Sequence, residues 1–180
     1  MKKLILLLFV LSLFSATSCN SDDDNSSQNP IDQLPPETQT GANTFGALLD
    51  GDVFIPQGVP NLVQCNYQLI NGERYFFVTG RMRDNTTFEL FSLSITTNAK
   101  EIVEGETYSL IEEADGNATG IYGYNGDLYF TNGVESGEVT ISRLDMNNQI
   151  VSGAFWFDVI DQNGDLRQIR EGRFDMQFTQ

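Results

Sequence analysis

Six Asn-Gly or Asp-Gly pairs lie between residues 50 and 164, and they constrain the fold more than any other feature of this chain. Both residues of such a pair tolerate the positive φ angles that the tight type I′ turn of a β-hairpin requires. The pairs are Asp50-Gly51, Asn71-Gly72, Asp115-Gly116, Asn125-Gly126, Asn132-Gly133 and Asn163-Gly164. We therefore predict β-turns at these positions and strands between them.

The runs between the turns are rich in Phe, Tyr, Val, Ile and Thr, which favour strands. They cover 44–49, 52–55, 61–70, 73–83, 86–97, 106–112, 119–124, 127–131, 136–144, 149–160 and 165–178. Several alternate at period two, as where Phe76, Val78 and Met82 share one face, and no long window has a helical stripe. The sequence predicts an all-β antiparallel meander of about 9–11 strands that closes into a barrel or folds into a two-sheet sandwich.

The first nineteen residues have the pattern of an export signal that ends in a lipid attachment site. Lys2 and Lys3 are basic, Leu4 to Phe14 form an apolar region, and small residues precede Cys19. The apolar region is shorter than the roughly 20 helical residues that cross a bilayer core. It resembles a bacterial lipoprotein signal, so we expect residues 1–18 to be cleaved and Cys19 to carry acyl chains such as palmitate. A plain secretory signal is the alternative.

An acidic run follows the cysteine directly, at Ser21, Asp22, Asp23 and Asp24. This run resembles the signal that sends lipoproteins of Bacteroidota to the outer face of the outer membrane. It predicts a lipid-anchored domain exposed at the cell surface. The alternative is an acidic spacer on an anchor that faces the periplasm.

Residues 19–42 are polar and contain three prolines, with only Ile31 and Leu34 as larger apolar residues. Such a segment buries too little surface to offset the entropy of ordering, so we predict a disordered tether. Residues 43–180 then form one domain.

Composition excludes several classes of function. The chain has no histidine, which removes Ser-His-Asp catalysis and histidine-ligated zinc. Without Lys2 and Lys3, the mature chain has 8 basic and 25 acidic side chains, a net charge of −17, so we expect no binding to nucleic acid. With Cys19 acylated, Cys65 has no disulfide partner and is expected to be a buried thiol. We predict no catalytic residue, metal or cofactor, and a monomer.

Three segments resemble a group of small Bacteroidota surface lipoproteins whose β-domain has no assigned function. The segments run from Thr44 to Pro56, from Ser152 to Phe157 and from Glu171 to Met176. The resemblance implies an anchored β-domain and no known reaction.

Three aromatic residues are candidates for stacking on a ligand. Tyr122 and Tyr124 share one face of a predicted strand, with glycines opposite, and Trp156 lies on the face opposite Phe155 and Phe157. Cross-strand packing of the tyrosines is the alternative. Asp161, Asn163 and Asp165 have a spacing like the start of a calcium loop, but the glycine position favours a hairpin turn.

The function predicted best is non-enzymatic binding or scaffolding at the cell surface, with an unidentified glycan or protein as partner. A glycan hydrolase that uses two carboxylates is a second hypothesis. A third is a barrel that holds a small apolar ligand, which would need small residues facing an internal void.

Overall fold

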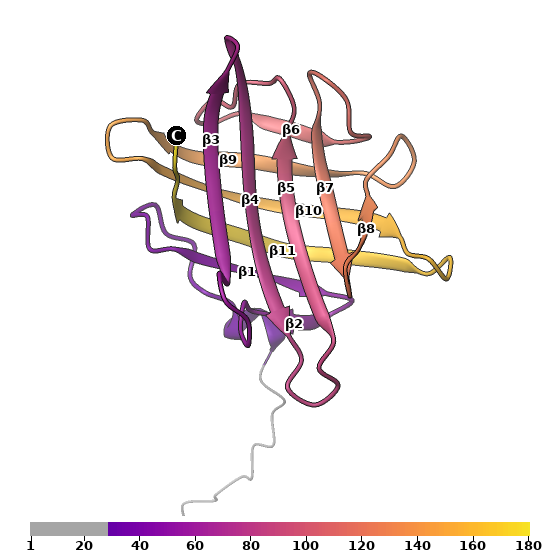
Figure 1. The fold of residues 1–180 in the computed structure, drawn as a ribbon. Coiled ribbons are helices and arrows are strands. Elements are labelled where there is room, and N and C mark those ends of the chain that lie inside the picture. Colours follow the sequence, from indigo (N-terminus) through magenta and orange to yellow (C-terminus); the bar gives the residue numbers. More distant parts are fainter. Residues whose placement is uncertain (1–28) are drawn as a thin grey trace, which may run out of the picture.

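The structure is a computed structural model, and it describes residues 29–180 (Figure 1). Eleven strands and one short 3-10 helix, η1 (Pro30–Gln33), make up the described part. The strands are β1 (Thr44–Leu49), β2 (Asp52–Phe54), β3 (Val63–Ile70), β4 (Glu73–Arg83), β5 (Leu90–Thr97), β6 (Thr107–Leu110), β7 (Ala118–Tyr124), β8 (Asp127–Phe130), β9 (Gly137–Asp145), β10 (Ile150–Ile160) and β11 (Leu166–Gln177). Each of the eleven predicted runs overlaps one strand, which confirms the all-β class.

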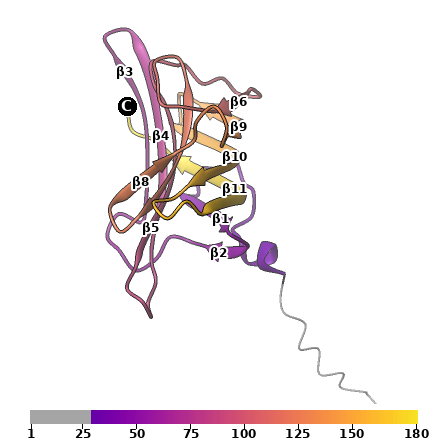
Figure 2. The same cartoon turned by 90° about the vertical axis from the view of Figure 1, so that its right-hand side faces the viewer.

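All eleven strands belong to a single, mostly antiparallel sheet that is not closed into a barrel. Their order is β2-β1-β11-β10-β9-β6-β7-β5-β4-β3, with β8 paired to β7. The sheet folds over on itself, so that β3, β4, β5 and β7 lie in front of β1, β9, β10 and β11 (Figures 1 and 2). Beyond the named strands, the last residues meet β3 through an isolated bridge between Asn66 and Thr179.

The predicted meander is wrong in two places. The consecutive strands β2 and β3 stand at opposite ends of the sheet order and do not pair, and β6 lies between β9 and β7 instead of beside β5. β1 does pair with the last strand, β11, as closure of a meander would require, but the sheet does not close into the barrel that was one of the two predicted forms. β6 and β7 are parallel at their one contact, Leu110 with Ala118. Turn signals identify neighbours that are joined by short loops, whereas these pairings depend on contacts between distant segments.

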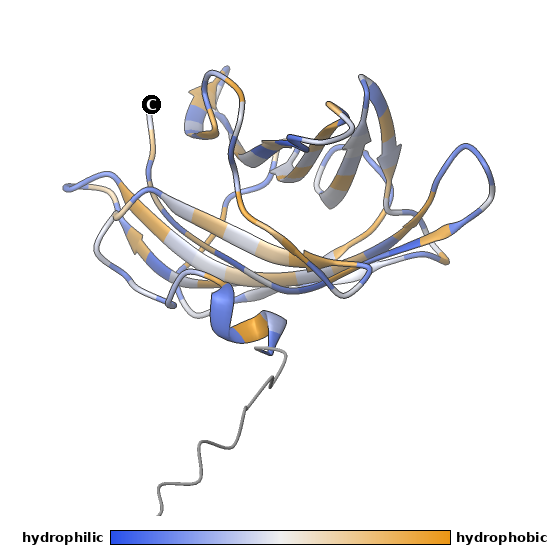
Figure 3. Cartoon of the chain, turned by 90° about the horizontal axis from the view of Figure 1, so that it is seen from below, coloured by the Kyte–Doolittle hydropathy of each residue, from blue (hydrophilic) through white to orange (hydrophobic). Residues whose placement is uncertain are grey.

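Phenylalanine rings from one layer fill space left by glycines in the other. A Cβ atom on Gly80 of β4 would lie 2.4 Å from the Phe45 ring of β1, and one on Gly120 of β7 would lie 2.7 Å from the Phe157 ring of β10. Hydrophobic and hydrophilic residues alternate in bands along the strands (Figure 3). The space beside Gly80 and Gly120, which face inward, is therefore filled by phenylalanine rings of the same chain and is not an internal void.

Residues 34–42, which we call the strap, lie against the outer face of the layer that contains β1 and β11. Leu34 is buried, and Pro35 occupies the space beside Gly46. The buried carboxylate of Asp175 in β11 accepts hydrogen bonds from Thr38, Thr40, Gly41 and Ala42 of the strap. The prediction that the disordered tether extends to residue 42 is therefore wrong for 30–42. Hydrogen bonds to one buried acid order the strap, and composition does not reveal them.

The lipidation and export predictions concern Cys19, Ser21, Asp22, Asp23 and Asp24, which lie outside the described residues. Within residues 29–180, no helix has the length and apolar character needed to span a bilayer. The predicted burial of Cys65 is confirmed, and burial raises the pKa of its thiol well above the usual range.

Candidate functional site: a trough around Trp156

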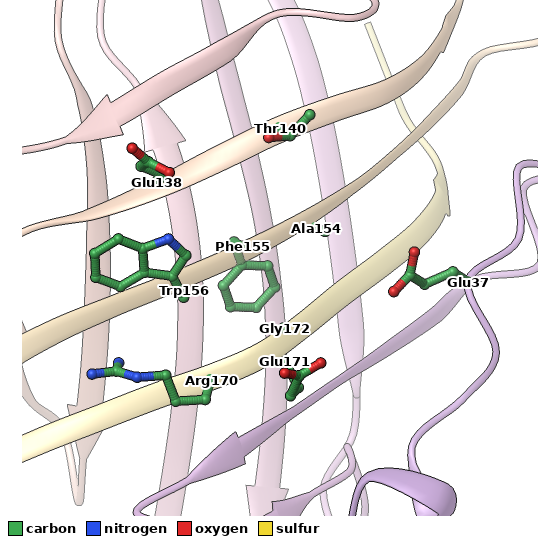
Figure 4. A pocket seen from close by; sticks show the side chains of 9 residues that line it. All are labelled: Glu37, Glu138, Thr140, Ala154, Phe155, Trp156, Arg170, Glu171 and Gly172. Carbon is green, nitrogen blue, oxygen red and sulfur yellow. The ribbon is translucent and has the colours of Figure 1, made fainter.

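Trp156 lies on the outer face of β10, as the alternation of the sequence predicted. Its neighbours Phe155 and Phe157 point into the core and are almost completely buried, whereas 38% of Trp156 is exposed. Figure 4 shows the indole broadside against β10, with Arg170 of the neighbouring strand beside it. An exposed tryptophan of this kind offers a large rigid surface for a ligand.

A trough of about 310 Å³ opens beside this indole. Ala154, which lies on the same face of β10 as Trp156, and Gly172 of β11 are the small residues that line it. The remaining lining residues are Glu37, Glu138, Thr140, Phe155, Arg170 and Glu171 (Figure 4). Three strands and the strap therefore contribute to one hollow.

A β-bulge in β11 shapes the trough opposite Trp156. Phe155 pairs with Gly172 and Phe157 pairs with Ile169, so two residues of β11 face the single residue Trp156. Glu171, one of the two, has φ of 53°, a left-handed conformation that is rare for residues other than glycine. Bulges redirect side chains and are common beside functional sites. Here the bulge places both Arg170 and Glu171 at the trough.

Arg170 is held in place by several contacts. Its guanidinium forms an ion pair of 2.7 Å with Asp158 and donates to the main-chain oxygens of Phe157 and Ile169. The guanidinium carbon lies 5.4 Å from the centre of the Trp156 ring, within the range of a cation–π interaction. These contacts hold the Arg170 guanidinium beside the indole.

A second hollow of about 330 Å³ continues the trough beneath the strap. It shares Glu37, Thr140 and Ala154 with the first, and Arg173 and Thr38 lie at its far end. Arg173 lies 4.0 Å from Glu37 of the strap and 3.5 Å from Glu171 at the bulge. The two hollows together form an elongated, polar surface with one aromatic platform.

The two candidate tyrosines are not on an open face. Tyr122 is only 3% exposed and stacks on Tyr129 of the neighbouring strand β8, with 5.8 Å between the ring centres. Burial raises its pKa to about 12, although nearby Arg167 acts in the opposite direction. Tyr124 is half-buried, packs against Phe91 and donates its hydroxyl to Glu89. The interpretation of an exposed tyrosine pair is wrong, because this face of β7 is turned toward the other layer.

The segment from Asp161 to Asp165 is a hairpin turn between β10 and β11, as predicted. The carboxylate of Asp161 accepts from the main-chain N–H groups of Asn163 and Asp165 and pairs with Arg167 at 2.7 Å.

The sequence analysis did not identify Glu138, Arg170 or Glu171. A signal was available for the bulge, because the glycine in Glu171-Gly172 stands inside a strand, and such glycines often mark bulges. No comparable signal identifies Glu138, which joins the site only because β9 pairs it with Trp156.

A family model matches residues 69–176. The model describes a domain of unknown function (DUF6252). The chain belongs to this family. The DUF6252 match spans β4 to β11 and so includes the strands of the trough, whereas the strap, β1 and β2 lie before it. No curated protein and no solved structure matches the chain significantly.

Proposed function

We propose that this DUF6252 domain is a non-enzymatic binding module that the lipid on Cys19 holds at the outer face of the outer membrane. The proposed ligand is a neutral surface glycan, bound in the trough around Trp156. The exposed indole face carries this proposal, because a rigid aromatic surface beside hydrogen-bonding side chains suits the flat, hydroxyl-rich face of a sugar ring.

The charges around the trough support a neutral ligand. Glu37, Glu138 and Glu171 line it, and both nearby arginines are engaged in ion pairs, Arg170 with Asp158 and Arg173 with Glu171. Glu138 forms no ion pair with another residue of 29–180. An anionic ligand would meet uncompensated negative charge, whereas sugar hydroxyls can donate to these carboxylates.

The proposal is tested by screening the protein against a panel of neutral and acidic glycans and measuring the best ligand by calorimetry. Trp156→Ala is expected to weaken binding at least about tenfold, as for a central aromatic contact. Leu166→Ala is the matched control, because Leu166 is similarly exposed but lies outside the trough. Equal binding by wild type and Trp156→Ala would exclude this site.

Hydrolysis of a glycan remains a second candidate, because Glu138 and Glu171 line the trough together with the aromatic platform. Glycosidases use two carboxyl groups that flank the scissile bond. Incubation of a bound glycan with the protein, followed by an assay for new reducing ends, separates the two functions. If the wild-type protein released new reducing ends and the variants Glu138→Gln and Glu171→Gln did not, the domain would be a hydrolase and the binding proposal would be wrong.

A further inference from the structure

Another hollow lies away from the trough, at the end of the molecule where β1 and β2 approach β4, β5 and β7. Its volume is about 450 Å³, within the range of small-molecule sites. β2 and the β4–β5 turn lie at the lower end of Figure 1, the end toward which Figure 3 looks. We call this hollow the mouth cavity.

The inner wall of the mouth cavity is apolar and aromatic. Phe54 of β2, Phe91 of β5 and Tyr122 of β7 line it, together with Leu49, Val53 and Met82. The Tyr122 hydroxyl makes no hydrogen bond to another residue of the described chain, so it is available to a ligand. Tyr122 was predicted as a ligand-stacking residue, and the structure places it in this wall instead of on an open surface.

The rim of the mouth cavity is acidic. Asp50, Asp52 and Asp84 line it, and Arg167 is the one basic lining residue. Arg167 is already paired, at 3.0 Å with Asp50 and at 2.7 Å with Asp161. Asp52 forms no ion pair within residues 29–180, and Asp84 uses its Oδ1 atom for the main-chain N–H groups of Thr86 and Thr87. The Asp52 carboxylate and the second carboxylate oxygen of Asp84 are therefore free to accept hydrogen bonds from a ligand.

Aromatic walls and unpaired carboxylates together select one chemical class. An apolar and aromatic wall favours the hydrocarbon body of a ligand, and a nearby carboxylate attracts a positively charged end. An anion would meet three carboxylates and an arginine that is already neutralised. We propose that the mouth cavity binds a small organic ammonium ion, with its apolar body against the half-buried Phe91 and its charged end at Asp52. This site is separate from the trough and does not depend on the proposed glycan function.

Three probes of similar shape test the proposal: phenethylammonium, the neutral 2-phenylethanol and the anionic 3-phenylpropanoate. Binding is followed by NMR through the methyl groups of Leu49, Val53 and Met82. Phenethylammonium is expected to shift these signals at the lowest concentration and 3-phenylpropanoate not at all. Equal binding of the three probes, or methyl signals that do not respond to phenethylammonium, would overturn the proposal.

Asp52→Asn tests the charge interaction directly. Asp52 is exposed, so the variant is expected to fold, and it should weaken phenethylammonium binding about five- to tenfold. Asp115→Asn, at an exposed turn outside the cavity, is the control and should bind as wild type does. Trp156→Ala should also bind the ammonium probe normally. An unchanged affinity in Asp52→Asn would show that the acidic rim does not select the ligand.

Discussion

The strap and Asp175 should stabilise each other, and this coupling can be measured. Asp175 is 1% exposed and accepts from Thr38, Thr40, Gly41 and Ala42 of the strap and from Ser152 of β10. Five of these six hydrogen bonds, between 2.6 and 3.2 Å, come from the strap. Burial alone would raise the pKa of Asp175, but these donors lower it well below the usual value.

Asp175→Asn is the informative change, because an amide offers one acceptor oxygen where the carboxylate offers two. Main-chain N–H groups that face the new NH₂ group would remain unpaired. Each unpaired buried group costs about 1–3 kcal/mol, so we expect a loss of about 3–5 kcal/mol in the free energy of unfolding. In a chain that starts at Asn43, the strap is absent and water reaches Asp175. There the same substitution should cost less than about 1 kcal/mol.

The assay is urea unfolding of four proteins: residues 29–180 and residues 43–180, each as the wild-type sequence and as the Asp175→Asn variant. The difference between the two substitution effects is the coupling free energy. Asp115→Asn serves as a control and should leave stability unchanged in both lengths. If Asp175→Asn destabilised 43–180 as much as 29–180, the strap would not be the partner of Asp175 and the reasoning would be refuted.

The lowered pKa of Asp175 determines how the stability of the domain should respond to acid. The folded pKa of Asp175 is lowered relative to the ordinary value of 3.8. Its contribution is therefore complete above that value and is lost as the pH falls toward the folded pKa. The stability difference between wild type and Asp175→Asn in residues 29–180 should shrink below about pH 4. A difference that stayed constant down to pH 2 would contradict this assignment.

Three further predictions concern the anchor and the core. Cys19→Ser should release the protein from the detergent phase in partitioning experiments, and normal partitioning would refute lipidation. Replacing Asp22, Asp23 and Asp24 by Ala should protect the domain from protease added to intact cells without changing lipidation; equal cleavage would mean that the run is only a spacer. Gly120→Ala places a methyl group 2.7 Å from the Phe157 ring and should lower the free energy of unfolding in urea by about 1–3 kcal/mol. Gly51→Ala is not a suitable control, because it would change a turn and not the core.

The turns and strands could be predicted because their causes are local. Asp50-Gly51, Asn71-Gly72 and Asn125-Gly126 all have positive φ at both residues, as the type I′ turn requires. Asn132-Gly133 does not, because neither residue has positive φ. The position of β6 and the pairing of β1 with β11 were not predictable from turns, since both depend on contacts between remote parts of the chain.

The candidate site was predictable only in part. Alternation with Phe155 and Phe157 placed Trp156 correctly on the outer face. The same rule put Tyr122 and Tyr124 together, but it could not decide which face of β7 is turned inward, because Ile121 on the opposite face is also hydrophobic and the two faces differ little. The strap was misjudged because a few hydrogen bonds to Asp175, and not apolar surface, hold it.

Trp156 is the only tryptophan of the chain, so its fluorescence reports on the trough alone. The most direct test of the proposed function is therefore a titration of the wild-type protein with the neutral glycan that the panel selects, under selective excitation of tryptophan. The account predicts a saturable change in Trp156 emission whose midpoint equals the dissociation constant from calorimetry. Saturable binding by calorimetry with unchanged emission would place the ligand elsewhere and contradict the central claim.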